Sequence, residues 1–211
     1  MTNFEADEIE AALRRGAAVD VDTQAEAATI AAIAAADRQG LIDVAVSTVD
    51  SPVGDLFVAV TPQGLVRLAF DPSHVLDDLA ERISPRVVES PARLDPVRHE
   101  LDEYFAGRRR AFDLVIDWSL TGGFRRQVLE ETARIPSGHV TTYGALAAQI
   151  GKPSAARAVG NALGSNPVAI VVPCHRVVPA GGGVGNYGGG PGRKAFLLDL
   201  EHAETGPKGR R

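Results

Sequence analysis

The chain has 211 residues, of which 45% are hydrophobic and 23% are charged. This composition is typical of a soluble globular protein and excludes a collagen-like or disordered chain. The length allows one large domain or two small ones. The formal net charge of −5 argues against a nucleic-acid partner, because DNA binding requires basic side chains that neutralise phosphates.

The charge is unevenly distributed along the chain. Residues 1–43 carry nine acidic and three basic side chains, and residues 44–120 carry 13 acidic and eight basic ones. Residues 121–211 carry five acidic and 11 basic side chains. We therefore expect the basic C-terminal part to have a partner of its own, and the overall acidity does not exclude DNA as that partner.

Cysteine content and hydropathy restrict the compartment. Cys174 is the single cysteine, so neither an intramolecular disulfide nor a zinc site with two cysteines can form. No run of apolar residues approaches the ~18 that a membrane-spanning helix needs. The apolar stretch 27–36 lies in an acidic segment without a basic leader, unlike a signal peptide. We expect a cytoplasmic protein without a membrane partner.

Residues 1–41 are expected to form an acidic helical extension. Asn3 is a candidate cap for a first short helix. Residues 23–38 are rich in alanine and predict a second helix that ends before Gly40. The sequence assigns no function to this extension.

Residues 42–120 alternate between apolar runs and turn residues in a pattern typical of a small α+β domain. Three strands separated by tight turns predict an antiparallel β-meander. The segments expected in this domain are strands at 42–49, 56–60 and 65–70, helices at 75–83 and 94–105, an edge strand at 86–89, and a further strand at 112–116.

From Gly122 onward helical patterns dominate. Helices are expected at 124–135, 142–150 and 154–163, and the last two are joined by the turn Gly151-Lys152-Pro153. Two helices joined by a short glycine-containing turn are typical of a helix-turn-helix, although two packed core helices give the same pattern. Thr141 or Thr142 is the expected N-cap of the first of the two helices, and Ser154 that of the second.

The predicted fold is thus an α+β N-terminal domain, an antiparallel meander with helices, followed by a mainly helical C-terminal domain containing a helix-turn-helix. The expected division of the chain is an acidic extension at 1–41, the α+β domain at 42–120, the helical domain at 121–203, and a basic, disordered tail at 204–211.

The second helix of the predicted motif is built mostly from small residues and carries Arg157 as its one long cation. Helices that recognise bases in the major groove usually carry several long polar side chains. Small residues instead let a helix backbone approach a surface closely, which suits contact with the minor groove. We expect Arg157 to contact DNA, and a solvated surface arginine is the alternative.

An apolar run ends at Pro173, and Cys174, His175 and Arg176 follow directly. A neighbouring base or cation lowers the pKa of a thiol, and the thiolate is the attacking species. Cys174 is therefore a candidate nucleophile, although a buried cysteine is more often inert. The glycine-rich loop 181–190 lacks the features of nucleotide-binding loops, but its backbone N–H groups can close over a ligand.

Pro173-Cys174-His175-Arg176-Val177 closely resembles the active-site signature of the O6-alkylguanine-DNA alkyltransferases, also called methylated-DNA–protein-cysteine methyltransferases. The resemblance is strong over residues 121–203 and looser over 42–120, and residues 1–41 have no counterpart in it. The other segments that match in order and spacing are Thr142-Tyr143-Gly144, 156–160, Asn166-Pro167, 185–187 and 197–201.

The resemblance implies catalytic roles for five residues. Cys174 is the expected alkyl acceptor, and His175 is the base that activates it through a water. Glu201 is expected to orient that histidine. Asn166 is implied to tie the helix-turn-helix to the active-site turn. Tyr143 is implied to help rotate the target nucleotide and to donate a hydrogen bond to the departing guanine.

The resemblance also implies DNA-binding and pocket residues. Arg157 is expected to fill the gap that a rotated base leaves in the stack. Other DNA-binding residues are expected on or beside the same helix: Ser154, Ala156, Ala158 and Gly160. The residues expected to line the substrate pocket are Arg176, Val177, Tyr187 and Gly188. Neither a metal site nor a cofactor is expected.

The implied reaction is a direct, stoichiometric transfer of an alkyl group from O6-alkylguanine in double-stranded DNA to Cys174. O4-alkylthymine is a further candidate substrate. Because the lesion lies inside the duplex, the base must first be flipped out. A monomer that acts once is expected. The alternatives are a non-catalytic lesion-binding protein, a transcriptional regulator and a Cys-His-Glu hydrolase; the presence of Cys174 argues against the first.

Overall fold

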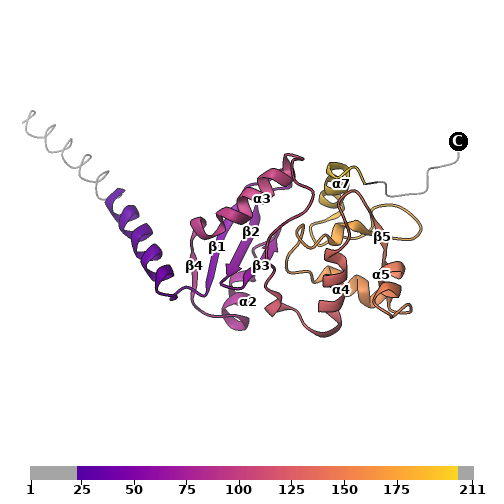
Figure 1. Cartoon of the computed structure of the whole chain (residues 1–211), viewed down its shortest axis with the longest axis horizontal. Coiled ribbons are helices and arrows are strands. Elements are labelled where there is room, and N and C mark those ends of the chain that lie inside the picture. The colour runs from indigo at the N-terminus through magenta and orange to yellow at the C-terminus, as the bar shows by residue number, and fades with distance from the viewer. Residues whose placement is uncertain (1–22, 204–211) are drawn as a thin grey trace, which may run out of the picture. The chain divides into compact units, whose positions relative to one another are not determined.

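The computed structural model describes residues 23–203 of the chain (Figure 1). The predicted helix capped by Asn3 and the predicted tail at 204–211 lie outside the described residues. The chain divides into two compact units, Met1–Ile42 and Asp43–Arg211. In the first unit, residues 23–38 form the predicted helix. Within residues 23–203, no helix is both long enough and apolar enough to cross a membrane.

The second unit begins with a four-stranded sheet of order β3-β2-β1-β4. Strands β1 (Val44–Val49), β2 (Leu56–Thr61) and β3 (Gly64–Ala69) form the predicted antiparallel meander. The predicted edge strand is β4 (Val87–Glu89), and it pairs parallel to β1. Its direction was not predicted, because strand direction depends on how the intervening helix returns the chain.

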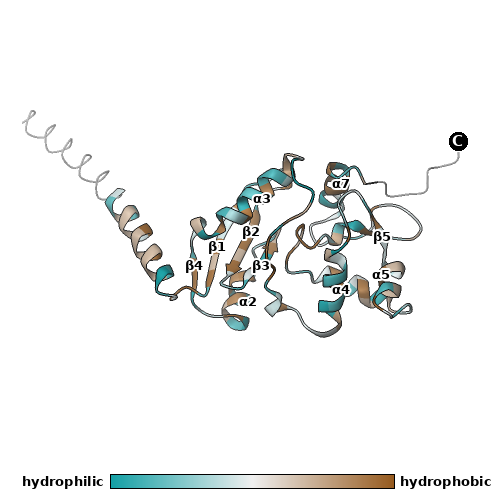
Figure 2. Ribbon diagram, in the orientation of Figure 1, coloured by the Kyte–Doolittle hydropathy of each residue, from teal (hydrophilic) through white to brown (hydrophobic). Residues whose placement is uncertain are grey.

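Helices cover both faces of this sheet, which explains why β2 is buried along its whole length. Helix α2 (Val75–Arg82) packs Val75 and Leu79 into a cluster with side chains of all three meander strands. The short helix η1 (Pro91–Leu94) contacts β1 and β2 and continues into α3 (Asp95–Phe105). Hydrophobic residues accordingly concentrate on the strands (Figure 2).

The prediction of a strand at 112–116 is wrong, because this segment forms no strand. The segment makes a single bridge between Ile116 and Leu65 before it turns into η2 (Trp118–Leu120). Asp117 ends the pairing because its carboxylate accepts hydrogen bonds from the backbone and side chain of Ser119. A Cβ on Gly64 would lie 2.3 Å from the Val115 carbonyl oxygen, so the close approach requires glycine there.

The C-terminal part is mainly helical, as predicted. Its elements are α4 (Gly123–Ala133), β5 (Thr141–Thr142), α5 (Tyr143–Gln149), α6 (Ala156–Gly164), η3 (Cys174–Arg176), β6 (Val177–Val178) and α7 (Pro191–Leu200). Helices α5 and α6 pack on each other as the helix-turn-helix pair, and both contact α4.

One of the two predicted helix caps is correct. The Thr142 hydroxyl accepts a hydrogen bond from the Ala145 backbone N–H at 3.1 Å and caps α5. The expected cap at Ser154 is wrong, because α6 begins at Ala156 and its N-cap residue is Ala155. The segment after Gly151, which has φ 73°, makes one further turn before the helix starts.

The outer edge of the sheet holds the segment that leads to the cysteine. Leu68 in β3 donates its backbone N–H to the Pro167 carbonyl at 2.8 Å, and its own carbonyl accepts from Ala169 at 3.1 Å. These bonds form an isolated parallel bridge between Leu68 and Val168. The N-terminal sheet therefore positions the backbone six residues before Cys174.

Candidate active site

Cys174 is the first residue of η3 and is 7% exposed. The side-chain amide of Asn166 donates to the Cys174 Sγ at 3.2 Å and to the Val172 carbonyl at 2.9 Å. The Asn166 side-chain oxygen accepts from the Val168 backbone at 3.0 Å. Asn166 thus spans the turn between α6 and η3 and reaches the thiol, which is where a residue linking the helix-turn-helix to the active-site turn must lie.

The His175 ring is fully buried and contacts Glu201 through Nε2, at 3.1 Å from Oε1. Burial lowers the pKa of His175, and the Glu201 carboxylate opposes this effect only in part. The other ring nitrogen, Nδ1, is buried and has no hydrogen-bond partner among the described residues. The imidazole therefore has one nitrogen held by the carboxylate and one still available.

Three side chains donate hydrogen bonds to the buried carboxylate of Glu201. Besides His175, these are the Arg176 guanidinium, at 2.9 and 2.7 Å, and the Tyr104 hydroxyl, at 2.7 Å. Burial alone would raise the pKa of Glu201, but the hydrogen bonds from His175 and Arg176 and their charges hold that pKa well below its usual value. Glu201 is therefore a carboxylate throughout the neutral pH range.

The thiol of Cys174 is subject to opposing influences. Burial raises its pKa, whereas the hydrogen bond from Asn166 and then the charge of Lys194 lower it. The Lys194 side chain is fully buried and its Nζ donates to the Val177 carbonyl at 2.7 Å and to the Asn186 carbonyl at 3.3 Å. Lys194 thus joins the strand after the cysteine to the glycine-rich loop.

A cavity of about 860 Å³ brings together half of the residues predicted from the motifs. Arg157 is an exposed side chain of its wall, and Tyr143 is half-buried at the start of α5. Gly160 faces the Tyr143 ring closely enough that an added Cβ would lie 3.8 Å from it. The predicted residues that line this cavity are Tyr143, Ala156, Arg157, Gly160, Cys174, Tyr187 and Gly188.

Seven predicted residues do not line this cavity. Three of them, Asn166, His175 and Glu201, are the partners of the cysteine and of its histidine described above. Ser154 and Ala158 are exposed elsewhere on the helix-turn-helix. Val177 is fully buried, and its carbonyl is taken by Lys194. Arg176 was expected to line the substrate pocket, but its guanidinium instead points to Glu201 and to the Ile135 carbonyl, because a buried arginine requires acceptors on several sides.

Two buried residues of the site were missed in the sequence. Lys194 lies on the same face of α7 as Leu197, Leu198 and Glu201, and a lysine at a buried position of an amphipathic helix is a signal that could have identified it. Tyr104 continues the buried face of α3 that includes Leu101. Nothing in the local sequence distinguishes Tyr104 from an ordinary core aromatic.

The arrangement is that of a cysteine-nucleophile protein with a helix-turn-helix, and comparisons with known proteins define it further. Two family descriptions match: the 6-O-methylguanine DNA methyltransferase, ribonuclease-like domain, over residues 44–118, and the DNA binding domain of the same family over residues 123–203.

Curated relatives match over most of their length. The methylated-DNA–protein-cysteine methyltransferase of Mycolicibacterium paratuberculosis is 44% identical, over 75% of this chain and 92% of that protein. The inducible enzyme of that name from Bacillus subtilis is 37% identical, over 70% of this chain and 84% of that protein. The chain belongs to the methylated-DNA–protein-cysteine methyltransferase family, as its motifs predicted.

Solved structures of the family share the fold. The crystal structure of Mycobacterium tuberculosis O6-methylguanine methyltransferase has a TM-score of 0.65 and 38% identity, over 78% of this chain and 96% of that chain. The structure of Mycobacterium tuberculosis OGT in complex with DNA has a TM-score of 0.65 and 39% identity, over 75% of this chain and 92% of that chain. The predicted fold class is confirmed.

Proposed function

We propose that this protein repairs DNA by transferring the alkyl group of O6-alkylguanine directly to Cys174. The observation that carries the proposal is that Cys174, Tyr143 and Arg157 line one cavity beside α6. In addition, His175 and Glu201 form a buried hydrogen-bonded pair next to the cysteine. Membership of the family and the DNA complex of a relative support DNA as the partner.

The lesion must leave the base stack before Cys174 can reach it, because O6 of guanine lies on a base edge inside the duplex. The cavity of about 860 Å³ lies within the range of volumes of ligand pockets and is large enough for one flipped base. Arg157, exposed on α6 at the rim, is the side chain proposed to occupy the vacated position. Tyr187 and Gly188 are proposed to contact the flipped base.

The proton of the thiol is proposed to pass to His175. Its Nε2 is held by Glu201, so Nδ1 is the nitrogen available to accept that proton, directly or through one water. The imidazolium that forms is stabilised by the Glu201 carboxylate. Arg176 and Tyr104 fix the orientation of this carboxylate and keep it ionised.

The Cys174 thiolate then attacks the carbon attached to O6. A sulfur–carbon bond forms as the carbon–O6 bond breaks, and the electron pair of the broken bond stays on guanine. Tyr143 is proposed to donate a hydrogen bond to the departing base, which lowers the cost of the developing negative charge. The thioether is stable, so each molecule reacts once, and no step uses a cofactor or a metal.

We infer that residues 121–203 bind DNA, that residues 42–120 hold the active-site segment through β3, and that the protein acts as a cytoplasmic monomer. Ser154 and Ala158, exposed on the helix-turn-helix, are proposed to contact the phosphate backbone rather than the flipped base.

Intact-mass measurement tests the proposed reaction. The protein is incubated with duplex DNA carrying one O6-methylguanine, and the same duplex with guanine is the control. We expect a gain of one methyl group per protein, located on Cys174 and absent in Cys174→Ala. Lesion-dependent binding without a mass gain would identify a non-catalytic lesion-binding protein, and repeated turnover would identify a hydrolase.

A further inference from the structure

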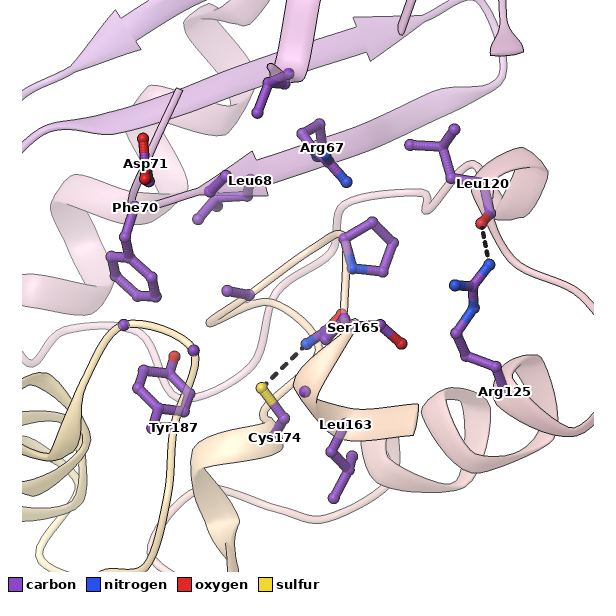
Figure 3. Close-up of a pocket in the computed structure, with 18 of the residues that line it drawn as sticks. Arg67, Leu68, Phe70, Asp71, Leu120, Arg125, Leu163, Ser165, Cys174 and Tyr187 are labelled. Carbon is purple, nitrogen blue, oxygen red and sulfur yellow. Dashed lines mark hydrogen bonds between the residues drawn. The ribbon is translucent and has the colours of Figure 1, made fainter. Parts of the chain in front are cut away.

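A second cavity, of about 420 Å³, reaches Cys174 from the side of the N-terminal sheet (Figure 3). Arg67 enters it from β3 and Arg125 from α4, and Cys174 lies with Leu163 on the opposite side. This cavity adjoins the one beside the helix-turn-helix, with which it shares five lining residues that include Cys174, but Tyr143 and Arg157 do not line it. Nothing in the proposed alkyl transfer uses Arg67 or Arg125.

Three arginines and one carboxylate line this cavity among the described residues: Arg67, Arg82, Arg125 and Asp71. Arg67 and Arg82 share a second carboxylate, that of Asp78, at 3.3 and 3.1 Å. Arg125 has no ion pair among the described residues, and its Nη2 donates only to the Leu120 carbonyl, at 2.6 Å. Asp71 is exposed and caps the Ser73 backbone. The cavity wall therefore has an excess of positive charge.

Two of the guanidinium groups have unused donors. Nε of Arg67 and Nε of Arg125 are both buried, and neither has a hydrogen-bond partner among the described residues. A buried donor without a partner costs free energy, so neither guanidinium has the full set of acceptors that a buried cation requires. Burial also lowers the pKa of Arg67; the charge of Asp78 opposes this effect in part, and the charge of Arg82 adds to it.

The rest of the wall combines polar and apolar groups. Ser165 and Asn166 are polar, but their donors already bond to backbone carbonyls and to Cys174. An apolar surface is provided by Leu68, Phe70 and Leu163. The guanidinium group of arginine matches the geometry of phosphate oxygens and binds them more strongly than neutral acceptors. A volume of about 420 Å³ is larger than a phosphate ion needs and falls within the range for small organic ligands.

We propose that this cavity is a binding site for a phosphate group, held by Arg67 and Arg125, either as free phosphate or as a small phosphate ester whose organic part contacts the apolar wall. The occupant is an inhibitor of the cysteine, because an anion beside a thiol disfavours the thiolate. Cys174 lines this cavity as well as the proposed base pocket, so binding at one affects the reaction at the other.

Calorimetric titration of the whole protein tests the site, with inorganic phosphate, deoxyguanosine monophosphate and deoxyguanosine as ligands. We expect saturable binding of a phosphate-bearing ligand, weakened about tenfold or more in Arg67→Gln because one charge-assisted hydrogen bond is lost. Arg67→Lys, which keeps the charge, should retain part of the affinity. Arg98→Gln is the matched control, since Arg98 pairs with Asp95 and does not line the cavity.

Comparison of the affinities of the three ligands identifies the occupant of the cavity. Equal affinity for phosphate and the nucleotide supports free phosphate as the ligand, and tighter binding of the nucleotide supports a phosphate ester. The proposal is overturned if no ligand binds saturably at millimolar concentration, if deoxyguanosine binds as well as its monophosphate, or if Arg157→Gln rather than Arg67→Gln abolishes binding. None of these outcomes depends on alkyl transfer from DNA.

A second experiment measures whether the bound ligand inhibits the reaction of Cys174. Phosphate or the nucleotide should slow the alkylation of Cys174 by iodoacetamide in the wild-type protein and in Arg98→Gln. In Arg67→Gln the same concentration should have little effect. An equal slowing in all three proteins would show that the anion acts elsewhere and would overturn the inhibitory role.

Discussion

The hydroxyl of Tyr104 in α3 donates a hydrogen bond to Oε1 of Glu201 at 2.7 Å, across 97 residues of sequence. Tyr104 is 2% exposed, and burial together with the charge of Glu201 raises the pKa of its hydroxyl. The N-terminal domain therefore supplies a direct partner to the carboxylate that holds His175. This contact links the helix that covers the sheet to the end of α7.

Removing the Tyr104 hydroxyl should affect both stability and reaction. Tyr104→Phe leaves a buried carboxylate with one donor fewer, and a hydrogen bond to a charged group contributes about 1.5–3 kcal/mol. We expect the free energy of unfolding to fall by about that amount in urea titrations. Alkyl transfer should slow, with its pH dependence shifted, because the carboxylate that orients His175 is less constrained.

Tyr187→Phe is the matched control for stability. The Tyr187 hydroxyl is buried without a hydrogen-bond partner among the described residues. Its removal should therefore leave the free energy of unfolding unchanged or slightly increased. A loss of stability equal to that of Tyr104→Phe would show that the Glu201 contact is not the cause.

Acidification should destabilise the fold in two stages. The pKa of buried His175 lies below its ordinary value of 6.5, so the histidine of the unfolded chain is protonated at a higher pH than that of the folded chain. The stability of the fold that depends on neutral His175 is therefore lost as the pH falls below 6.5. The pKa of Glu201 is also lowered, so a second contribution is lost below its ordinary value of 4.5. Urea unfolding from pH 8 to pH 2 measures both, and His175→Gln should lack the first stage.

The amide of Asn166 should control the reactivity of the thiol. Asn166→Ala removes the hydrogen bond to Cys174 Sγ, so the pKa of the thiol should rise and its alkylation by iodoacetamide should slow about tenfold at neutral pH. Gln149→Ala changes an exposed amide side chain of α5 that lines neither cavity and should leave the rate unaltered. The measurement is the alkylation rate against pH; identical profiles for both variants would contradict the prediction.

Arg157 should matter for duplex DNA and not for the chemistry. Arg157→Ala should slow methyl transfer from O6-methylguanine in a duplex far more than transfer from an O6-alkylguanine free base, because the free base needs no flipping. If Arg157 also meets a phosphate, the slope of log affinity against log salt should decrease by about 0.9.

Arg134→Ala tests whether any surface arginine of this basic domain has the same effect. Arg134 is exposed and pairs with Glu131, and it does not line the cavity beside α6. Its removal should change duplex repair only slightly. Equal losses on duplex and free base in Arg157→Ala would instead indicate a structural role for Arg157.

The sequence by itself determined the local elements and the chemistry that neighbours in the chain provide. Apolar runs separated by tight turns predicted the meander, and adjacency in the chain placed Cys174 beside His175. The match to the family added Glu201, although that residue is 26 positions from the histidine. These features depend on residues within one segment or on a motif that spans a single domain.

Only the tertiary structure decided which distant side chains complete the site. Tyr104 carries no local signal, and Arg176 changed from an expected pocket residue to a partner of Glu201 because burial forces a guanidinium to find acceptors. The direction of β4 and the arginine-lined cavity likewise depend on how whole elements pack. The burial and the hydrogen-bond partners of a side chain depend on groups that are close in space but distant in sequence, so a local sequence pattern does not predict them.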